Sequence, residues 1–442
     1  MNNIITAKFG GTSLASASQI RKAAEIIKAN PSRKYLVASA PGKRFSDDIK
    51  ITDLLYTCYA QCKTGDDKNF SATLEKISDR YAEIIKELEI DFDLEAEIKA
   101  LEKNLLASKT PDYAASRGEY INSKIIAKFL AWDFVDAAEI IFFKDNGTLN
   151  ESKTFKTAGE KLKNLSHAVV PGFYGSLPDG SIKTFSRGGS DVTGSIVARS
   201  VEADLYENWT DVSGMLSADP RIVKDPEVIN YITYTELREL SYMGASVLHE
   251  DAVFPVRKAG IPINIRNTNR PEDKGTLISA SRPADAPHKA VTGIAGRKGF
   301  SSIRVEKSMM NSETGFGAKL LYIFSRNGIP FEHCPTGIDT ISVFVSSSLF
   351  DEKRETILRE IKNELAPDFI TIEKNLAAVA VVGEGMVSAN GMAARVFSAL
   401  AKAGINIRMI DQGSDELNII VGINESDYEN SIRALYNEMI LK

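Results

Sequence analysis

The sequence of 442 residues is poor in cysteine and histidine, with three and four respectively. Cys58, Cys62 and Cys334 are too few for a disulfide framework. Cys58 and Cys62 are spaced to share one face of a helix, but no second pair of ligands accompanies them, so we interpret them as thiols of the protein interior rather than a metal site.

Long apolar runs and an excess of either charge are also lacking. No run approaches the roughly 18 apolar residues of a membrane span, and the first residues do not follow the pattern of a signal peptide. The net charge is −5, with acids and bases interspersed, which gives no surface for nucleic acid or an anionic membrane. Hydrophobic residues make up 43% and charged residues 26%, as in globular proteins. We expect a cytoplasmic enzyme of two to four domains.

The first two thirds of the chain alternate short apolar runs with helical patterns, which predicts an α/β fold with helices covering a sheet. The charge-rich residues 67–109 predict a helical excursion on the surface, and the proline-bearing residues 281–287 predict a linker. The predicted strands are residues 35–40, 138–143, 168–174, 205–209 and 261–265.

A glycine pair follows the apolar run at residues 4–7, in the segment KFGGTS at 8–13, and a helical pattern covers 14–29. Glycines let the backbone approach a ligand closely, and the next helix offers free N–H groups. Lys8 adds a positive charge, while the Walker pattern is absent. These residues predict a phosphate-binding loop of another kind, the alternative being an ordinary turn beside a solvated lysine.

A second glycine pair lies in SRGGSD at 186–191, between a strand-like run at 182–185 and a helical pattern at 192–201. An arginine holds carboxylates or phosphates through two parallel hydrogen bonds. Asp191 either caps the helix or positions a lysine or a metal. If both loops follow strands of one sheet, they converge at the carboxyl edge, where open α/β folds bind ligands.

An internal repeat occupies the last third of the chain. With a shift of 76 residues, three glycines and a run of alternating apolar residues coincide without a gap. Each copy predicts the order strand, helix, strand, turn, strand, helix. The alternative is a pair of modules of this type without a ligand role. The coinciding positions are Gly315 with Gly391, Gly328 with Gly404, Gly337 with Gly413, and 341/343/345 with 417/419/421.

Together these features resemble the aspartate kinases (aspartokinases) over essentially the whole chain. The amino-acid-kinase motifs are KFGGTS at 8–13, RGE at 117–119, SRGGSD at 186–191, WTDVSGMLSADPR at 209–221 and GASVLH at 244–249, and the ACT motifs are GFGAKL at 315–320 and AVVGEG at 380–385. The resemblance implies an amino-acid-kinase-type α/β/α sandwich followed by two ferredoxin-like (βαββαβ) ACT domains. The predicted limits are 1–285 for the catalytic domain, 303–375 for the first ACT domain, and 288–302 plus 376–442 for the second.

The resemblance also implies transfer of the γ-phosphoryl of ATP, with Mg²⁺, to the β-carboxylate of L-aspartate, giving 4-phospho-L-aspartate, without metal ligands from protein side chains. A carboxylate nucleophile needs no general base, so the scarcity of histidine is no objection. The implied catalytic residues are Lys8 and Asp191; those for aspartate are Thr52, Glu119, Arg187 and Ser190; those for ATP are Lys8, Phe9, Gly10, Gly11, Thr210, Asp211, Leu216, Arg221, Ser246 and Val247.

Two positions depart from the family pattern. Ser246 stands where a lysine is frequent and Leu216 where a tyrosine is common, so at these positions we expect backbone contacts to ATP rather than side-chain contacts. His249 is interpreted as structural.

Two other functions are considered. Another amino-acid kinase, acting on glutamate, acetylglutamate, carbamate or UMP, is disfavoured by the paired repeats and by Glu119 with Arg187. A catalytically inactive amino-acid sensor is disfavoured by the intact Lys8, Arg187 and Asp191.

The two repeats differ at one informative position, since Glu332 of the first corresponds to Arg408 of the second. The strand-like residues 291–296 are expected to complete the sheet of the second copy, which would insert the first copy into the second. We expect feedback inhibition by L-lysine, with threonine as the alternative, and a homodimer or dimer of dimers through the ACT domains. The predicted effector residues are Met310, Ser312, Gly315, Phe316, Gly317, Glu332, Gly337 and Ile338.

Overall fold

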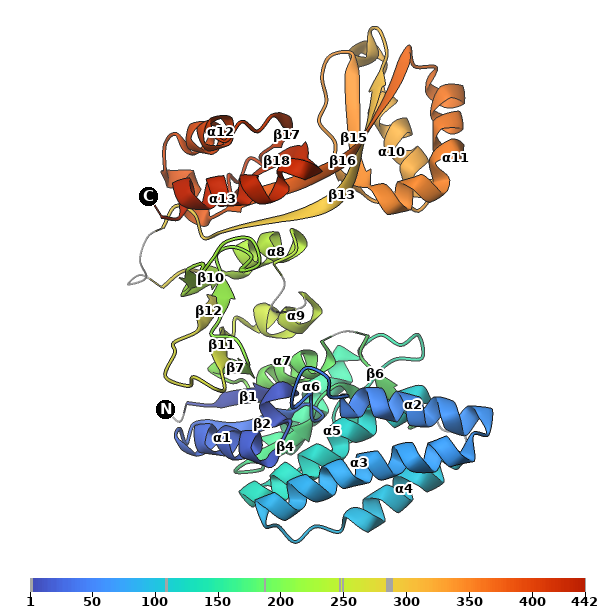
Figure 1. The fold of residues 1–442 in the computed structure, drawn as a ribbon, viewed down its shortest axis with the longest axis vertical. Coiled ribbons are helices and arrows are strands. Elements are labelled where there is room, and N and C mark those ends of the chain that lie inside the picture. Colours follow the sequence, from blue (N-terminus) through green and yellow to red (C-terminus); the bar gives the residue numbers. More distant parts are fainter. Residues whose placement is uncertain are drawn as a thin grey trace. The chain divides into compact units, whose positions relative to one another are not determined.

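The computed structural model describes residues 3–107, 110–186, 188–245, 248, 250–283 and 289–441 (Figure 1). The chain forms two compact units. The first comprises residues 1–215, 228–234 and 247–284, and the second comprises 216–227, 235–246 and 285–442. The chain crosses between them within strand β8 (Met215–Leu216), before β9 (Val228–Ile229) and within helix α8 (Tyr234–Tyr242). Part of the predicted linker at 281–287 lies outside the described residues.

An eight-stranded sheet forms the centre of the first unit, in the order β10-β12-β11-β7-β1-β2-β4-β3. Apart from the antiparallel pair β11–β12, neighbouring strands are parallel. Strand β1 lies between β2 and β7, so its end lies well inside the sheet. The strands are β1 (Ile5–Phe9), β2 (Arg33–Ala38), β3 (Asp133–Phe134), β4 (Ala168–Pro171), β7 (Leu205–Thr210), β10 (Tyr231–Thr233), β11 (Ile263–Asn267) and β12 (Thr276–Ser279).

Helices cover both faces of this sheet (Figure 1). The core on one face joins α1, α2, α3, α4 and α5 to Phe9 and Trp209 of the sheet. Helix α7, flanked by α6 and α9, covers the other face. The helices are α1 (Ala17–Lys28), α2 (Ile51–Thr64), α3 (Asp67–Leu88), α4 (Leu94–Leu106), α5 (Pro111–Leu130), α6 (Glu151–Leu162), α7 (Gly189–Ser200) and α9 (Glu250–Ala259), with 3-10 turns η1 (Thr12–Leu14) and η2 (Ala137–Glu139).

Three local predictions need correction. Residues 138–143 form no strand: the Asp136 side chain accepts a hydrogen bond from the Ala138 amide at 3.0 Å, and this cap starts η2 instead. The run 168–174 divides into β4 and β5 (Tyr174–Ser176), because Phe173 has a φ of 81° that interrupts an extended strand. Strand β6 (Ile182–Thr184) pairs with β5 in a separate two-stranded sheet, so the second glycine loop does not follow a strand of the main sheet.

In the second unit, one six-stranded antiparallel sheet joins the two repeats, in the order β14-β15-β13-β16-β18-β17. The long strands β13 (Gly293–Glu306) and β16 (Phe369–Val382) pair along their whole length and belong to both repeats. Residues 293–298 pair with 377–382 of the second copy, as the interleaved arrangement requires. The other strands are β14 (Phe331–His333), β15 (Thr340–Ser346), β17 (Ile407–Asp411) and β18 (Asn418–Asn424).

The repeats also agree in their turns. Gly315 and Gly391 precede helices α10 and α12 with φ values of 85° and 81°, and Gly328 and Gly404 have values of 69° and 72°. Residues other than glycine adopt this conformation only with strain. Each copy has its own hydrophobic core. The helices are α10 (Phe316–Arg326), α11 (Ser347–Leu365), α12 (Met392–Lys402) and α13 (Tyr428–Met439), with 3-10 turns η3 (Met310–Ser312), η4 (Glu384–Ser388) and η5 (Glu425–Asp427).

Two segments within the predicted catalytic domain cluster with the ACT pair, a division that sequence reasoning missed. Ala218 and Val223 pack in the core of the second copy, and the Tyr436 hydroxyl accepts a hydrogen bond from the Glu227 amide at 3.0 Å. Residues 235–246, with most of α8, form the other segment. The proposed domain limits therefore stay a prediction. No helix in the described part of the chain combines the length and the apolar character of a membrane span.

Candidate active site

A buried lysine marks the carboxyl end of β1. Lys8 is 7% exposed, and its Nζ lies 2.5 Å from Asp191 Oδ1, in the first turn of α7. Lys8 is also directly opposite Asn208 in the β1–β7 register, with 3.5 Å between Nζ and the Asn208 Oδ1. The Asn208 amide donates to the same Asp191 oxygen at 2.9 Å. The three side chains thus hold one positive charge in a fixed place, and Asp191 pairs with a lysine instead of capping its helix.

The glycine pair lies directly beside this lysine. The Gly10 amide donates to the Trp209 carbonyl at 3.0 Å, and a Cβ on Gly10 would lie 3.7 Å from Lys8 Nζ. A Cβ on Gly11 would lie 2.9 Å from the Ala40 carbonyl, because the loop after β2 passes against it. The Gly42 amide donates to the Gly11 carbonyl at 2.8 Å. Glycine is therefore required for the close packing of two loops at this edge.

Arg80, a residue that sequence reasoning missed, braces both loops from α3. Its guanidinium donates to the carbonyl of Ala15 at 2.9 Å and to that of Gly42 at 2.7 Å, and it lies 2.8 Å from Asp48. Arg80 is 5% exposed. The helical excursion therefore supports the first glycine loop and the loop after β2, and the separation in sequence gave no local signal of this contact.

The second glycine loop reaches the same edge through α7. Gly188 has a φ of 54° and precedes the helix, and a Cβ on Gly172 would lie 2.6 Å from the Ser190 side chain. Ser190 therefore lies against the chain that follows β4, in the turn of α7 that also carries Asp191. The prediction that the two loops converge holds for Lys8 and Asp191, although β6 is outside the main sheet. Arg187 lies outside the described residues.

Glu119 is a buried carboxyl on α5. Burial raises the pKa of Glu119 from 4.5 to about 8, and hydrogen bonds from the backbone of Ala40 and of Glu119 itself oppose this rise. Its Oε2 atom has no hydrogen-bond partner among the described residues. Gly118 lets α5 approach the Ala40 loop, since a Cβ there would lie 2.8 Å from the Ala40 Cβ. Glu119 thus has one buried carboxyl oxygen, Oε2, without a partner among the described residues, and it lies close to the glycine loops.

The remaining predicted contacts to aspartate and ATP belong to several different elements. Thr52 is half-buried in the first turn of α2. Thr210 ends β7, and its hydroxyl lies 3.2 Å from a carboxylate oxygen of the exposed Asp211. Leu216 and Arg221 belong to the second unit, where the Arg221 side chain is 88% exposed and pairs with Asp219 at 2.6 Å. Ser246, Val247 and His249 lie outside the described residues. Among the described side chains, no group of three or more His, Cys, Asp or Glu is placed to hold a metal ion.

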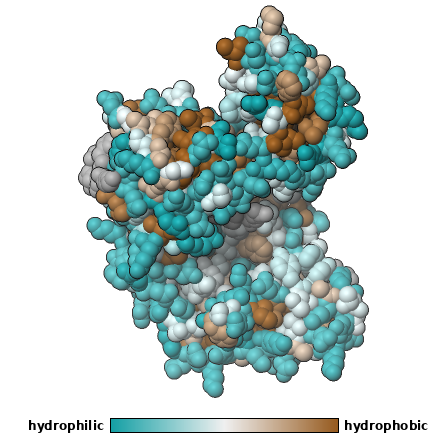
Figure 2. Space-filling view, turned by 45° about the horizontal axis from the view of Figure 1, so that its top comes forward, coloured by the Kyte–Doolittle hydropathy of each residue, from teal (hydrophilic) through white to brown (hydrophobic). Residues whose placement is uncertain are grey.

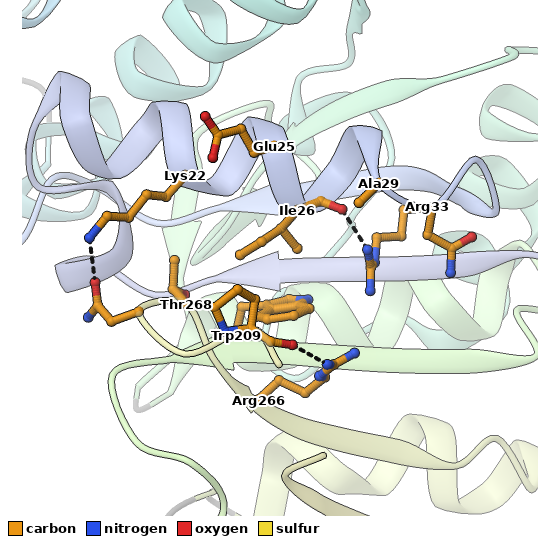
Figure 3. A pocket seen from close by; sticks show the side chains of 11 residues that line it. Lys22, Glu25, Ile26, Ala29, Arg33, Trp209, Arg266 and Thr268 are labelled. Carbon is orange, nitrogen blue, oxygen red and sulfur yellow. Dashed lines mark hydrogen bonds between the residues drawn. The ribbon is translucent and has the colours of Figure 1, made fainter. Parts of the chain in front are cut away.

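A cleft of about 640 Å³ lies on the α1 side of the sheet (Figure 3). Trp209 lines it, with the guanidinium carbons of Arg33 and Arg266 at 5.3 and 4.7 Å from its ring centroid. Glu207, 2% exposed, accepts hydrogen bonds from Arg33 at 2.7 and 3.0 Å and from Trp209 Nε1 at 2.9 Å. Because side chains alternate along β7, this cleft and Asn208 lie on opposite faces of the sheet. The buried ion pair joins β2 to β7 across β1.

The predicted effector residues of the first ACT copy occupy two places. The first is the approach to α10, where Met310 and Phe316 are buried in the core and Gly315 precedes the helix. Ser312 lies in η3, and Gly317 lies in the first turn of α10. The Gly337 amide donates to the Thr340 carbonyl at 2.7 Å, and the next residue, Ile338, is 71% exposed. The second place is Glu332 on β14, where Glu332 accepts a hydrogen bond from the Tyr242 hydroxyl.

Comparisons with known proteins match both parts of the chain. A sequence model of the amino acid kinase family matches residues 3–267, and one of the ACT domain matches residues 379–439. Aspartokinase 3 of Bacillus subtilis (strain 168) is 39% identical over 98% of this chain and 97% of its own. The crystal structure of Clostridium acetobutylicum aspartate kinase is 50% identical, with a TM-score of 0.88 over 99% of this chain and 100% of that chain.

A more distant structure shares the fold. The crystal structure of E. coli aspartokinase III in complex with lysine and aspartate is 24% identical, with a TM-score of 0.70 over 99% of both chains. The fold class expected from the motifs is confirmed, and so is the resemblance on which that expectation was based. From its glycine loops, its paired ACT repeats and these likenesses, the chain belongs to the aspartate kinase family of ATP-dependent kinases.

Proposed function

We propose that this kinase transfers the γ-phosphoryl of ATP to the β-carboxylate of L-aspartate, giving 4-phospho-L-aspartate. The observation that carries the proposal is the buried Lys8, 2.5 Å from Asp191 and beside the Gly10 backbone. A lysine so placed stabilises the negative charge that spreads over a transferring phosphoryl group. Asp191 and Asn208 hold its ammonium in one position, so little reorganisation is needed during the reaction.

ATP enters as its magnesium complex, whose metal neutralises phosphate charge. The Gly10 amide already donates to the Trp209 carbonyl, so the Gly11 amide and the α7 N-terminus are proposed to supply the donors for phosphate oxygens beside Gly10. Thr210 and Asp211 are proposed to contact the nucleotide, with Phe9, Leu216, Arg221, Ser246 and Val247 as further predicted contacts. The β-carboxylate of aspartate is itself the nucleophile, and therefore the chain needs to supply position and charge rather than a base.

Glu119 is proposed to bind the α-ammonium of aspartate. Its buried oxygen without a partner supports this role, because an ammonium would supply the missing hydrogen bond and the compensating charge. Thr52 and Ser190 are proposed to add hydrogen bonds, and Arg187 to hold the α-carboxylate.

One assay tests this reaction against its alternatives. ADP formation is measured with the purified full-length chain, MgATP and either L-aspartate, L-glutamate or no acceptor, and trapping with hydroxylamine identifies an acyl phosphate product. We expect turnover with aspartate at least about a hundredfold above that with glutamate. Preferred turnover of glutamate would overturn the substrate assignment, and turnover with neither would support an inactive sensor.

The first ACT copy is proposed to bind L-lysine as a feedback inhibitor. N–H groups at the start of α10 suit a carboxylate, and Glu332 suits an ammonium. The E. coli protein of the same fold was crystallised with lysine and aspartate. Arg408, at the Glu332 position of the second copy, would repel a cation. We expect Glu332→Ala to raise the lysine concentration for half inhibition at least about tenfold. Arg408→Ala is the matched control, and inhibition by threonine but not by lysine would overturn the effector assignment.

Association through the ACT domains is also proposed. Strand β14 is an edge of the described sheet, and Phe331 on it is 47% exposed beside Tyr322, which is 63% exposed. They line an apolar groove of about 510 Å³. Figure 2 shows hydrophobic side chains gathered on the surface of the second unit. We expect a dimer or a dimer of dimers in light scattering at micromolar concentration, and a monomer with and without lysine would contradict this.

A further inference from the structure

Helix α8 is docked onto the ACT pair by polar contacts of one buried and one half-buried carboxylate. Glu236 is fully buried and accepts hydrogen bonds from the Thr292 hydroxyl at 2.5 Å and the Glu384 amide at 2.9 Å. One turn later, Glu239 accepts from the Asn418 amide group at 2.7 Å. Since removing one partner from a buried carboxylate is costly, this part of α8 is firmly held.

The last residue of α8 contacts the proposed effector site. The Tyr242 hydroxyl donates to the Glu332 carboxylate, and Arg297 donates to the Tyr242 carbonyl at 3.3 Å. Arg297 also lies 4.0 Å from Glu332. Tyr242 is 52% exposed; its partial burial, and next the hydrogen bond to Glu332, raise the pKa of Tyr242 to about 12, so the hydroxyl keeps its proton at neutral pH. Glu332 therefore already has partners from its own chain.

Ending the helix does not require this contact. Gly244, with a φ of 99°, follows α8, its amide donates to the Ser241 carbonyl at 3.0 Å, and the Ala245 amide donates to that of Leu240 at 2.9 Å. These bonds terminate a helix without help from side chains. The tie from Tyr242 to Glu332 is thus an additional connection between α8 and the first ACT copy.

We propose that Tyr242 competes with the effector's ammonium for Glu332, and that effector binding releases the end of α8. The inference rests on the proposed role of Glu332. One carboxylate serves either the phenol of its own chain or the ammonium of a bound amino acid. From Tyr242 the chain continues through Met243–Ala245 to the residues predicted to contact ATP. The effector therefore favours the state in which Tyr242 has left Glu332, and the two equilibria affect each other reciprocally.

Tyr242→Phe tests the competition, because it removes the hydroxyl and keeps the ring. Calorimetry of the full-length protein with L-lysine should give a Kd about three- to tenfold lower in the variant than in the wild type. Inhibition at saturating lysine should be weaker, because α8 has lost the contact that lysine breaks. Tyr59→Phe is the control, since the Tyr59 hydroxyl on α2 makes no hydrogen bond with any described residue. A purely structural role would not tighten binding while weakening inhibition.

Hydrogen exchange of the amides at 235–242 provides a readout that needs no effector. Without lysine, Tyr242→Phe should exchange faster near the end of α8 than wild type, and saturating lysine should raise wild-type exchange toward the variant's. Unchanged or weaker lysine binding in the variant, or unchanged exchange, would overturn the competition. If wild type binds no lysine but the variant exchanges faster, the hydrogen bond from Tyr242 to Glu332 does hold the end of α8. In that case the displacement of this bond by lysine, and the assignment of lysine as the effector, are wrong.

Discussion

If Glu119 binds the α-ammonium of aspartate as proposed, its ionisation sets how aspartate binding depends on pH. With a pKa of about 8, the free enzyme carries this carboxyl mainly as the neutral acid at pH 7, with about one tenth ionised. An ammonium is bound by the carboxylate, so binding must release the proton. That release lowers the affinity about tenfold at pH 7, equivalent to about 1.4 kcal/mol.

We therefore expect kcat/KM for aspartate to rise steeply up to the pKa and then to level. From the ionised fraction of Glu119 alone, kcat/KM should increase about 25-fold from pH 6.5 to 8.5 and about eightfold from pH 7 to 8.5. Initial rates at subsaturating aspartate and saturating MgATP measure this. Calorimetric titration with aspartate in buffers of different ionisation enthalpy should show about 0.9 proton released per site at pH 7.

Two variants separate Glu119 from other ionisations. Glu119→Gln should have low kcat/KM for aspartate and no rise with pH. Asp53→Asn changes an exposed carboxyl on α2 and should keep the wild-type slope. A wild-type profile that is flat from pH 6.5 to 8.5, or a Glu119→Gln profile with the same slope as wild type, would refute the argument.

Three further predictions follow from the described contacts. Because the folded-state pKa of Glu119 is raised, the contribution of the protonated carboxyl to stability is complete below pH 4.5 and is lost as pH rises through 8. The free energy of unfolding in urea should therefore fall less between pH 5.5 and 8.5 in Glu119→Gln than in wild type. Lys8→Ala should reduce kcat at least about a hundredfold, and Asn208→Leu about tenfold, at saturating substrates; a loss below about tenfold for Lys8→Ala would make that lysine a bystander. Gly315→Ala and Gly391→Ala should each cost about 1 kcal/mol of unfolding free energy from positive φ, and Gly315→Ala alone should alter lysine inhibition.

Local patterns revealed the first glycine loop, but not the partners of its lysine. The strand, glycine pair and helix at residues 5–28 are adjacent in sequence, so composition and periodicity predict them. Asn208 is 200 residues from Lys8, and only the β1–β7 register brings them together. The available signal was Asn208 itself, a polar residue inside a strand. That signal does not identify the residue that Asn208 contacts.

The failed strand at 138–143 shows how a local contact overrides a pattern. The apolar residues of this run suit a buried strand. However, the Asp136 side chain accepts a hydrogen bond from the Ala138 amide, and this cap favours a 3-10 turn at the start of the run. At the end of the run, Phe142 and Phe143 make isolated bridges to Ser176 and Leu149 rather than a ladder. The helical excursion at 67–109 was easier to predict, because α3 and α4 are long and amphipathic.

The internal repeat carries less functional information than its shared glycines suggest. Gly315 and Gly391 have nearly the same positive φ, as do Gly328 and Gly404, so the backbone alone requires glycine at each. The informative position is the one where the copies differ. Arg408 lies 3.3 Å from Glu373, whereas Glu332 accepts a hydrogen bond from Tyr242 of α8, a helix outside the repeats. Since α8 has no counterpart within either repeat, the duplicated fold becomes asymmetric at its contact with this helix, and that asymmetry favours one regulatory copy over two equivalent ones.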